Sequence, residues 1–383
     1  MKFANGAKTM RRSVLRNTLS IALFAFAVVA TCAVAASAQW QQEWEKTVKA
    51  AEQEGKVVVW AVGGRLQREW LVESFQKTYP KISVEFLTRA DRAAPKIIAE
   101  QQQGMFLADI LVGGTNLVEA LLPAKALDPV PPALIHPDAR DQSKWFDGKF
   151  HWADDEQQQY SLLMRGEFLS LLAVNTKLAD PASFRSYWDI VDPKWKGKIV
   201  MQDVRAPGPG GGGAVFFLLH PDLGEKFLRK LFGETNATTS TDRKQAIDWL
   251  ARGRHAVSVF PDSEDLKRLQ KEGFPLKEIP WTQMKEGSAM SSGTHQLSLL
   301  KQAPNRNAAK VYINWLLSRE GQTAQVQQTL SPSLRMDVPE DVVKAVLEPW
   351  ERIQPGKKYT MISQWRYRKY SKQVRNLARE LLR

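Results

Sequence analysis

The chain has 383 residues, of which 43% are hydrophobic and 25% are charged, close to the average for globular proteins. This composition excludes a disordered chain, a collagen-like chain and a membrane protein with several spans. The length predicts about two domains.

The formal net charge of +13 is concentrated at the two ends of the chain. Residues 1–38 carry five Lys or Arg and no acidic residue, and residues 351–383 carry ten Lys or Arg against two acidic residues. Residues 39–350 are therefore neutral overall. A nucleic-acid-binding protein presents basic residues over a folded face together with stacking aromatic side chains, so we expect no nucleic-acid partner.

The first 38 residues have the pattern of an export signal. Basic residues are followed by an apolar run, Ile21–Ala35, and then by Ala36-Ser37-Ala38. The apolar run is shorter than the roughly 20 residues of a membrane helix. We expect cleavage after Ala38 and a periplasmic product. Arg11-Arg12 resembles a twin-arginine signal, so the general and the twin-arginine export routes both remain open.

The only cysteine, Cys32, lies inside this apolar run. The mature chain is then expected to form neither disulfides nor thiolate metal sites.

The first part of the mature chain alternates between strand and helix patterns. Short β-branched runs end in glycine pairs, and the runs between them repeat apolar residues at helical spacing. This alternation predicts an α/β fold with a parallel sheet, whose ligand sites lie beyond the carboxyl ends of the strands. The predicted strands are 56–62, 82–86 and 108–112, and the predicted helices are 66–79, 93–103 and 117–122.

A second α/β unit follows an irregular, proline-rich connection at 128–155. Its predicted strands are 168–174, 198–201 and 256–260, with helices from residue 215 and at 243–251. A further strand at 296–300 and a helix at 308–317 come after it. No internal repeat is visible.

The C-terminal residues predict an amphipathic helix. Tyr367, Tyr370, Val374, Leu377 and Leu381 recur at spacings of three and four, which places them on one face, with cations on the others. In one interpretation this face packs on the body of the protein. In the other, the helix forms a surface that binds anionic lipid or an acidic partner.

No pattern of catalytic residues stands out. The sequence has no Walker-type phosphate loop, no His-Glu-x-x-His, no paired cysteines and no Gly-x-Ser-x-Gly. The five histidines are dispersed without the spacing of metal ligands. We therefore expect a protein that is not an enzyme and has no cofactor and no resident metal.

Two features point instead to ligand binding. The run Gly208-Pro209-Gly210-Gly211-Gly212-Gly213 stands between a predicted strand and a predicted helix, with Arg205 nearby. Such a glycine run can bind an anion through its backbone N–H groups, or it can form a tight turn without binding a ligand. Trp60 ends a predicted central strand beside the Gly63-Gly64 turn, where a ligand is expected.

Several segments resemble bacterial extracellular solute-binding proteins of family 1, in the branch with ferric-iron receptors, which are the receptor subunits of ABC importers. The resemblance spans about residues 40 to 380, and 303–322 is its most specific part. The segments are Phe75-Gln-Lys-Thr-Tyr79-Pro80, Ala108-Asp109-Ile110, Ala303-Pro304-Asn305-Arg306-Asn307-Ala308-Ala309-Lys310, Asn314-Trp315-Leu316-Leu317-Ser318-Arg319-Glu320-Gly321-Gln322 and Ser333-Leu334-Arg335-Met336-Asp337-Val338.

The resemblance implies a type 2 periplasmic-binding-protein fold with two α/β lobes joined by crossing hinge strands, expected at 168–174 and 296–300. Residues 39–167 and 296–383, including the C-terminal helix, would form lobe 1, and residues 168–295 lobe 2. Such a receptor, expected to be a monomer, captures a small solute in the inter-lobe cleft and delivers it to an ABC transporter permease.

Position in that fold suggests which residues line the cleft. Arg335 has the alternative role of tying the C-terminal segment to the body, and Asp262 with Ser263 that of capping a helix. The expected ligand-binding residues are Trp60, Gly63, Gly64, Arg65, Gly114, Thr115, Asn116, Arg205, Gly210, Gly211, Gly212, Asp262, Ser263, Ser291, Ser292 and Arg335.

The chain departs from ferric receptors at the metal site. Such receptors commonly hold iron with an adjacent tyrosine pair, often with a histidine after the first strand, whereas this chain has no Tyr-Tyr and has Arg65 near the histidine position. An anionic solute or a metal chelate is therefore favoured, and ferric iron, a sugar and a polyamine are the alternatives. A secreted hydrolase or transferase on the same fold, or a ligand sensor for a membrane receptor, are the alternative functions.

Overall fold

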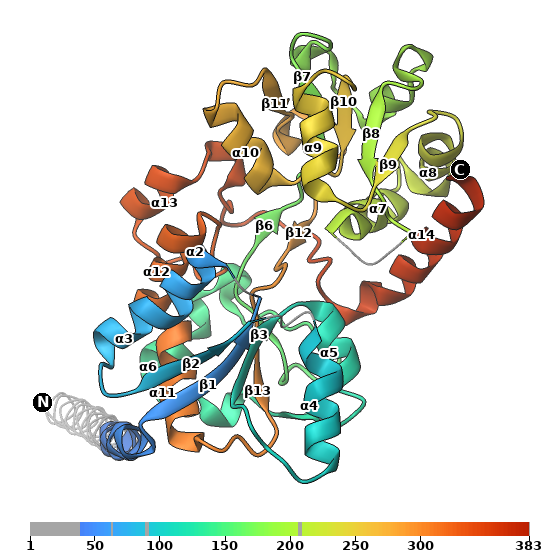
Figure 1. The fold of residues 1–383 in the computed structure, drawn as a ribbon. Coiled ribbons are helices and arrows are strands. Elements are labelled where there is room, and N and C mark those ends of the chain that lie inside the picture. Colours follow the sequence, from blue (N-terminus) through green and yellow to red (C-terminus); the bar gives the residue numbers. More distant parts are fainter. Residues whose placement is uncertain (1–38, 63, 89–91, 206–208, 383) are drawn as a thin grey trace, which may run out of the picture.

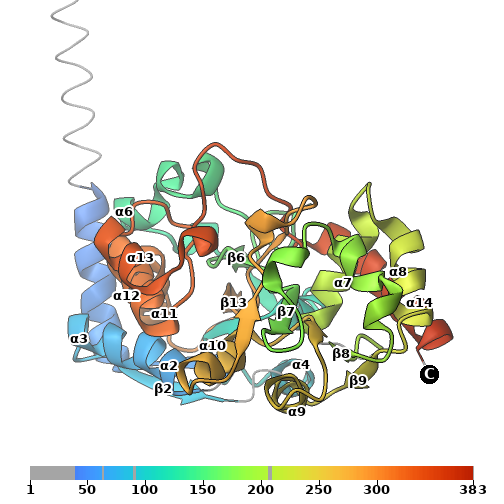
Figure 2. The same ribbon diagram turned by 90° about the horizontal axis from the view of Figure 1, so that it is seen from above.

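The protein has two α/β lobes connected at a narrow waist, as Figure 1 shows from the side and Figure 2 from above. The computed structural model describes residues 39–62, 64–88, 92–205 and 209–382. The expected signal peptide with its cleavage site after Ala38, and the expected ligand residue Gly63, lie outside this part.

The sheet of the first lobe has the strand order β2-β1-β3-β13-β4, with β5 paired to β13. β1 is parallel to both of its neighbours, and the chain passes from β1 to β2 on one side but from β3 to β4 on the other, so the strand order reverses between β1 and β3. Ligands bind at such a switch point in open α/β sheets. The strands are β1 (Lys56–Ala61), β2 (Ser83–Leu87), β3 (Ile110–Gly113), β4 (Leu127–Asp128), β5 (Leu162–Leu163) and β13 (Gln296–Leu300).

Helices cover both faces of this sheet and enclose two apolar clusters. The predicted helix 66–79 corresponds to a continuous helical stretch from α2 to α3 that contains a π-helical turn, Glu69–Ser74. Trp70 and Phe75 from this stretch are fully buried. The helices are 39–54, α2 (Arg65–Arg68), α3 (Phe75–Thr78), α4 (Ala93–Gln102), α5 (Thr115–Leu121), α6 (Pro137–Arg140), α11 (Arg306–Leu317), α12 (Arg319–Thr329) and α13 (Glu340–Val346).

The second lobe has its own sheet, in the order β11-β7-β10-β8-β9, and its own apolar clusters. Its central strands are buried along their whole length, as expected for β-branched runs covered on both faces. The elements are β7 (Leu172–Asn175), β8 (Ile199–Gln202), α7 (Pro209–Leu219), α8 (Gly224–Gly233), β9 (Thr238–Ser240), α9 (Arg243–Ala251), β10 (Val257–Val259), α10 (Ser263–Lys271) and β11 (Leu276–Glu278).

The crossing strands are shorter than the sequence predicts: β6 (Glu167–Phe168) overlaps the expected segment 168–174 only at Phe168, and β12 (Met290–Ser291) lies before the expected segment 296–300. β6 pairs with β12 in the waist, whereas β7 and β13 belong to the two sheets. Long apolar strands are stable only where both faces are covered, so they lie inside the lobes. A third connection accompanies this pair, because the Ile362 N–H donates to the Met290 carbonyl at 2.9 Å.

The C-terminal helix α14 (Arg368–Leu381) has the expected apolar face but not the expected partner. Val374, Leu377 and Ala378 are buried in the core of the second lobe, where α14 packs on α7 and α8. The assignment of this helix to lobe 1 is therefore wrong. Of the helices in the described ranges, none combines the length and hydropathy needed to cross a bilayer.

A buried carboxylate connects three segments of the first lobe. Asp109, which is fully buried, accepts the Val58 N–H at 2.8 Å, and from Asn305 it accepts the backbone N–H at 2.7 Å and the side-chain amide at 2.9 Å. Burial raises the pKa of Asp109, and these hydrogen bonds oppose the rise. The carboxylate fixes β1 beside the start of β3 and holds the loop that leads from β13 into α11.

Replacing Asp109 by Ala should lower the free energy of unfolding by about 3 kcal/mol, because it leaves these buried N–H groups without acceptors. Urea unfolding followed by circular dichroism measures the change. Asp128→Ala is the matched control in the same sheet, since Asp128 accepts one exposed bond from the Gln302 N–H. We expect that control to lose less than about 1 kcal/mol, and equal losses for the two variants would contradict the role of Asp109.

Candidate functional site

The first-lobe side of the waist begins where β1 and β3 end next to each other. Ala61 and Val112 are paired in the parallel ladder, and α2 and α5 start just beyond. The backbone of Gly113 packs closely on α5, because a Cβ there would lie 2.4 Å from Leu117 Cδ1 and would force that side chain to move. A Cβ on Gly114 would lie 3.4 Å from the carbonyl oxygen of Gly293. The expected segments 114–116 and 291–292 are therefore brought together.

Hydroxyl groups tie these two segments to the C-terminal connection. Thr115 Oγ1 donates to the Ser363 carbonyl at 3.0 Å and accepts from Gln296 Nε2 at 2.8 Å. Ser363 Oγ lies 3.1 Å from Ser291 Oγ and accepts the Ser292 N–H at 2.9 Å. Three of the expected ligand residues thus hold the waist together, and the exposed Asn116 takes no part in these bonds.

Arg165, which sequence analysis missed, lies in the same place. It stands between β5 and β6, where the chain leaves the first lobe, and its N–H donates to Ser292 Oγ at 3.3 Å. Its Nη2 lies 2.8 Å from Glu167 Oε2, and only 17% of its side chain is exposed. Its Nε is buried and has no hydrogen-bond partner among the described residues. The guanidinium therefore retains an unused donor in the waist.

Gly293 makes room for this guanidinium. Its φ of +52° lies in the left-handed region, and a Cβ at this position would be 2.1 Å from Arg165 Nη2. Both the backbone conformation and the close approach require glycine.

His295 forms the buried wall beside Arg165. Its ring centroid lies 5.1 Å from that of Trp70, and its Nε2 lies 3.0 Å from Gln67 Nε2. Because that amide nitrogen can only donate, Nε2 accepts and Nδ1 carries the proton. Complete burial, and then the charge of Arg165, hold the pKa of His295 well below its ordinary value. The imidazole is therefore neutral, which leaves Arg165 as the cation of this wall.

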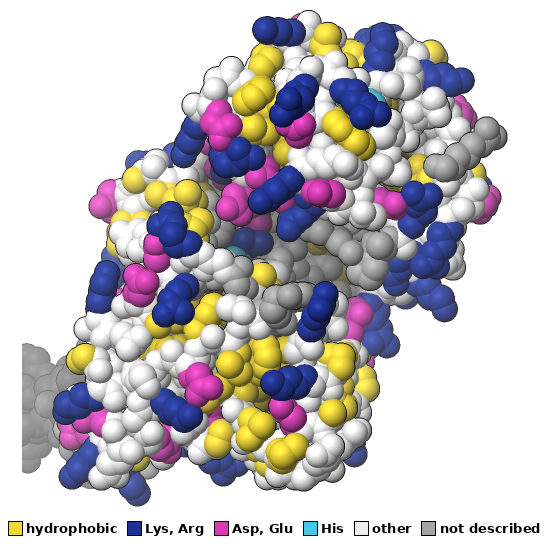
Figure 3. Space-filling view, viewed as in Figure 1, with side chains coloured by type: hydrophobic (Ala, Val, Ile, Leu, Met, Phe, Trp, Pro, Cys, Tyr) yellow, Lys and Arg dark blue, Asp and Glu magenta, His cyan; other side chains and the backbone are white. Residues whose placement is uncertain are grey.

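The second-lobe side of the waist carries both acidic and basic side chains. Burial raises the pKa of Glu278 on β11 to about 7, with Glu351 and Glu167 adding to the rise and Ser170 and Lys267 opposing it. Lys267 forms an ion pair with Glu351. Figure 3 shows acidic and basic side chains close together on the edge of the second lobe that faces the first.

The remaining expected residues of the first lobe lie near the waist or on a sheet face. Gly64 and Arg65 begin the helical stretch that carries Gln67, and Arg65 forms an ion pair with Glu69. Trp60 lies on the sheet face covered by α4, where Lys96 Nζ is 5.4 Å from its ring centroid.

Arg335 does not line the cleft, and this expectation is corrected. Its side chain is fully buried, and all five N–H groups are used by Asp138, Asp337 and the Leu317 carbonyl. The alternative, a structural tie, is the one that the structure supports.

Arg205 likewise has a structural role. Its guanidinium bonds to Asp203 at 2.8 Å, to Thr239 Oγ1 at 3.2 Å and to the Leu382 carbonyl at 3.3 Å. It supports the end of α14, so the expectation that it assists an anion in the glycine run is not supported.

The glycine run allows the first turns of α7 to pack closely against neighbouring side chains. Cβ atoms at 212 and 213 would lie 2.7 Å from Ile362 and 2.4 Å from Phe260, and the Gly210 N–H donates to Gln202 Oε1 at 2.6 Å. Gly211 has open space around it.

Asp262 and Ser263 begin α10. Asp262 accepts the Asp265 N–H at 3.0 Å as the helix cap and forms an ion pair with Arg243 at 2.7 Å. The capping role considered from the sequence is thus the observed one.

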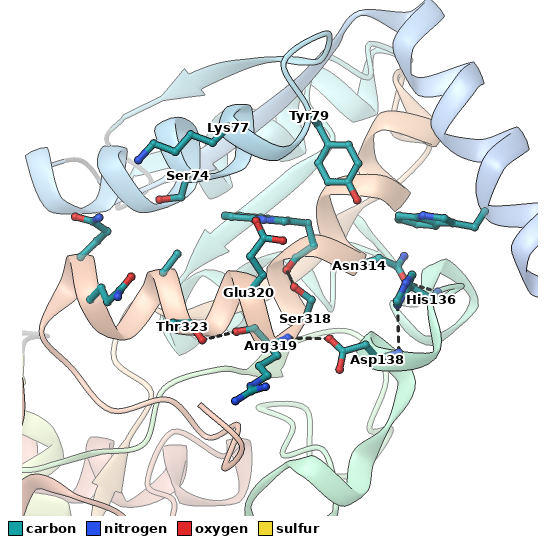
Figure 4. A pocket seen from close by; sticks show the side chains of 15 residues that line it. Ser74, Lys77, Tyr79, His136, Asp138, Asn314, Ser318, Arg319, Glu320 and Thr323 are labelled. Carbon is teal, nitrogen blue, oxygen red and sulfur yellow. Dashed lines mark hydrogen bonds between the residues drawn. The ribbon is translucent and has the colours of Figure 1, made fainter. Parts of the chain in front are cut away.

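A separate groove of about 710 Å³ lies on the first lobe, between the helix 39–54, α3 and α12. Figure 4 shows Tyr79, His136, Asp138 and Glu320 around it. Burial, and then the charge of Glu320, raise the pKa of Tyr79 to about 12. The groove contains none of the expected ligand residues, and its lining comes from one lobe only. Across the described ranges, no group of three or more His, Cys, Asp or Glu side chains is arranged to hold a metal ion.

The buried state of His295 predicts a pH-dependent contribution to stability. Its pKa is lower in the folded than in the unfolded protein, so the unfolded state takes up a proton near pH 6.5 and the folded state does not. The free energy of unfolding of the wild type should therefore fall relative to that of His295→Gln as the pH drops from 7 to 5. The difference totals about 2 kcal/mol over this range, and its slope approaches about 1.4 kcal/mol per pH unit only below about pH 6.

Urea unfolding at several pH values measures this difference. Glu278 has the opposite sign, because its raised pKa adds stability at low pH, but both proteins contain it and it cancels. Parallel pH curves for the two proteins would contradict a buried, neutral His295.

The fold matches that of many solved periplasmic binding proteins. Iron-bound HitA from Pseudomonas aeruginosa is 18% identical, with a TM-score of 0.60 over 85% of this chain and 99% of that chain. AfuA from Actinobacillus pleuropneumoniae with fructose-6-phosphate is 20% identical, with a TM-score of 0.56 over 85% and 97%. PotD, a spermidine/putrescine-transporter binding protein from Streptococcus pneumoniae, is 18% identical, with a TM-score of 0.55 over 85% and 98%.

These likenesses confirm the two-lobed fold. No curated protein sequence matches the chain. Residues 70–274, more than half of the chain, match the family described as bacterial extracellular solute-binding protein. This family consists of binding proteins, and the chain belongs to it.

Proposed function

We propose that this protein is the periplasmic receptor of an ABC importer. It is exported with a signal peptide that is cleaved after Ala38, captures one small solute between its lobes as a monomer, and delivers it to the permease without chemical change. The family and the two-lobed fold support this function. The short two-residue pair of β6 and β12 gives the lobes a narrow hinge about which to close.

We infer the class of ligand from the guanidinium of Arg165. A buried donor without a partner is costly, and an arginine presents its N–H groups in a plane that matches a carboxylate or a phosphate. The neighbouring His295 is neutral and Glu167 already pairs with Arg165 Nη2, so the unpartnered Nε is the donor that this wall offers to an anion. The ligand is therefore an anionic solute, either free or as a metal chelate.

The range of ligands among the structural relatives is broad. HitA was solved with iron and AfuA with fructose-6-phosphate, and PotD is named as the substrate-binding protein of a spermidine/putrescine transporter. Arg165 favours the anionic members of this range for the present chain. A bare ferric ion would need hard oxygen ligands, and the tyrosine pair that commonly supplies them in ferric receptors is missing from the sequence.

Native mass spectrometry of protein purified from its own periplasm, combined with elemental analysis for iron, tests the proposal. We expect an organic anion that is retained in the native protein and lost on denaturation. Arg165→Ala should weaken its binding by about tenfold to a hundredfold, because a charged hydrogen bond is worth about 1.5–3 kcal/mol.

Arg252→Ala is the matched control, since Arg252 is exposed on the second lobe and pairs only with Asp248. It should retain the ligand with wild-type affinity. Iron without an organic anion, a polycation, or full retention by Arg165→Ala would each contradict the assignment.

A further inference from the structure

Helix α14 carries five Lys or Arg against one acidic residue, a balance of +4, which is half of the +8 of the mature chain. Arg368, Lys369, Lys372 and Arg379 are exposed, and Glu380 is the only acidic residue of the helix. Residues 39–350 are neutral overall, so the excess positive charge of the mature chain lies in residues 351–383, which include this helix. Figure 3 shows Lys and Arg side chains gathered along the right-hand edge of the molecule, where Figure 1 places α14.

Two lysines of this face are not engaged by carboxylates. Lys369 and Lys372 line a shallow groove of about 410 Å³ between α8 and α14, together with Arg229 and Glu380. Arg229 uses both nearby carboxylates, with distances of 2.8 Å to Glu225 and 3.0 Å to Glu380. No ion pair forms at Lys369 or Lys372 within the described ranges. Both ammonium groups therefore remain available to an external anion.

The apolar face of α14 is already occupied. Val374, Leu377 and Ala378 are buried against the second lobe, so the outward surface is mainly polar. A protein partner would need an apolar centre for a stable interface, which this surface does not provide. A lipid bilayer needs none, because each lysine or arginine close to an anionic surface contributes about 1 kcal/mol without shape complementarity.

We propose that the exposed face of α14 binds the anionic headgroups of a lipid bilayer. Binding is peripheral, reversible and screened by salt, because no apolar side chain of the helix is free to insert. It leaves the inter-lobe cleft open and concentrates the protein at the membrane surface.

Co-sedimentation of the mature chain with vesicles of phosphatidylglycerol and phosphatidylcholine tests this proposal. We expect binding at an ionic strength of about 0.05 M that is lost at about 0.5 M, and no binding to vesicles of phosphatidylcholine alone. The double variant Lys369→Gln/Lys372→Gln should bind roughly twenty-fivefold more weakly, about fivefold for each lysine.

The helix 39–54 supplies a matched control. Lys46 and Lys49 are exposed lysines with the same spacing of three on the first lobe, so Lys46→Gln/Lys49→Gln removes the same charge elsewhere. This variant should bind like the wild type, and thermal unfolding checks that both variants are folded. The proposal is overturned by equal losses in both variants or by no binding at low salt. Lysine-dependent binding to the permease in neutral lipid, without vesicle binding, would also overturn it and assign the face to a protein partner.

Discussion

The carboxylate of Asp109 is the interaction on which the first lobe depends. It bonds to β1 through Val58 and to the start of α11 through Asn305, although these residues are far apart in the sequence. Glu54 acts in parallel, because its carboxylate accepts the N–H groups of Asn307 and Ala308 at 3.2 and 2.7 Å. Together they fix the chain where it returns from the second lobe, and thereby fix the edge at which β1 and β3 end.

The segments that identified the family are the ones that hold this lobe together. Asp109 and Asn305 share buried hydrogen bonds, Asn314 bonds to the backbone at Ile135 and His136, and Arg335 joins Asp138 to Asp337. Buried polar groups need specific partners at fixed places, so such residues leave a recognisable pattern in a sequence. The fold could therefore be predicted from the sequence, whereas the ligand could not.

The candidate site is less predictable because its residues come from separate connections. Arg165 precedes a crossing strand, Gly293 and His295 follow another, and Ser363 comes from the third connection. None of them belongs to a periodic pattern. An arginine with all its donors satisfied, such as Arg335, looks the same in sequence as Arg165, whose Nε is free, so only the surrounding carboxylates distinguish the two. For a related reason, the sequence did not show on which lobe α14 packs. Both lobes have apolar surface that its apolar face could cover.

The position of β13 determines the order in which the lobes can fold. This strand lies between β3 and β4 in the first sheet, yet the chain reaches it only after the whole second sheet has been made. The first lobe therefore keeps an unpaired edge on β3 while the second lobe, whose strands are continuous in sequence, can already assemble. Contacts over such long sequence separations form slowly, and exposed strand edges pair readily with other chains. Growth from the N-terminus thus leaves the first sheet incomplete until β13 has been made, so during synthesis the edge of β3 is the part of this lobe most open to wrong pairing.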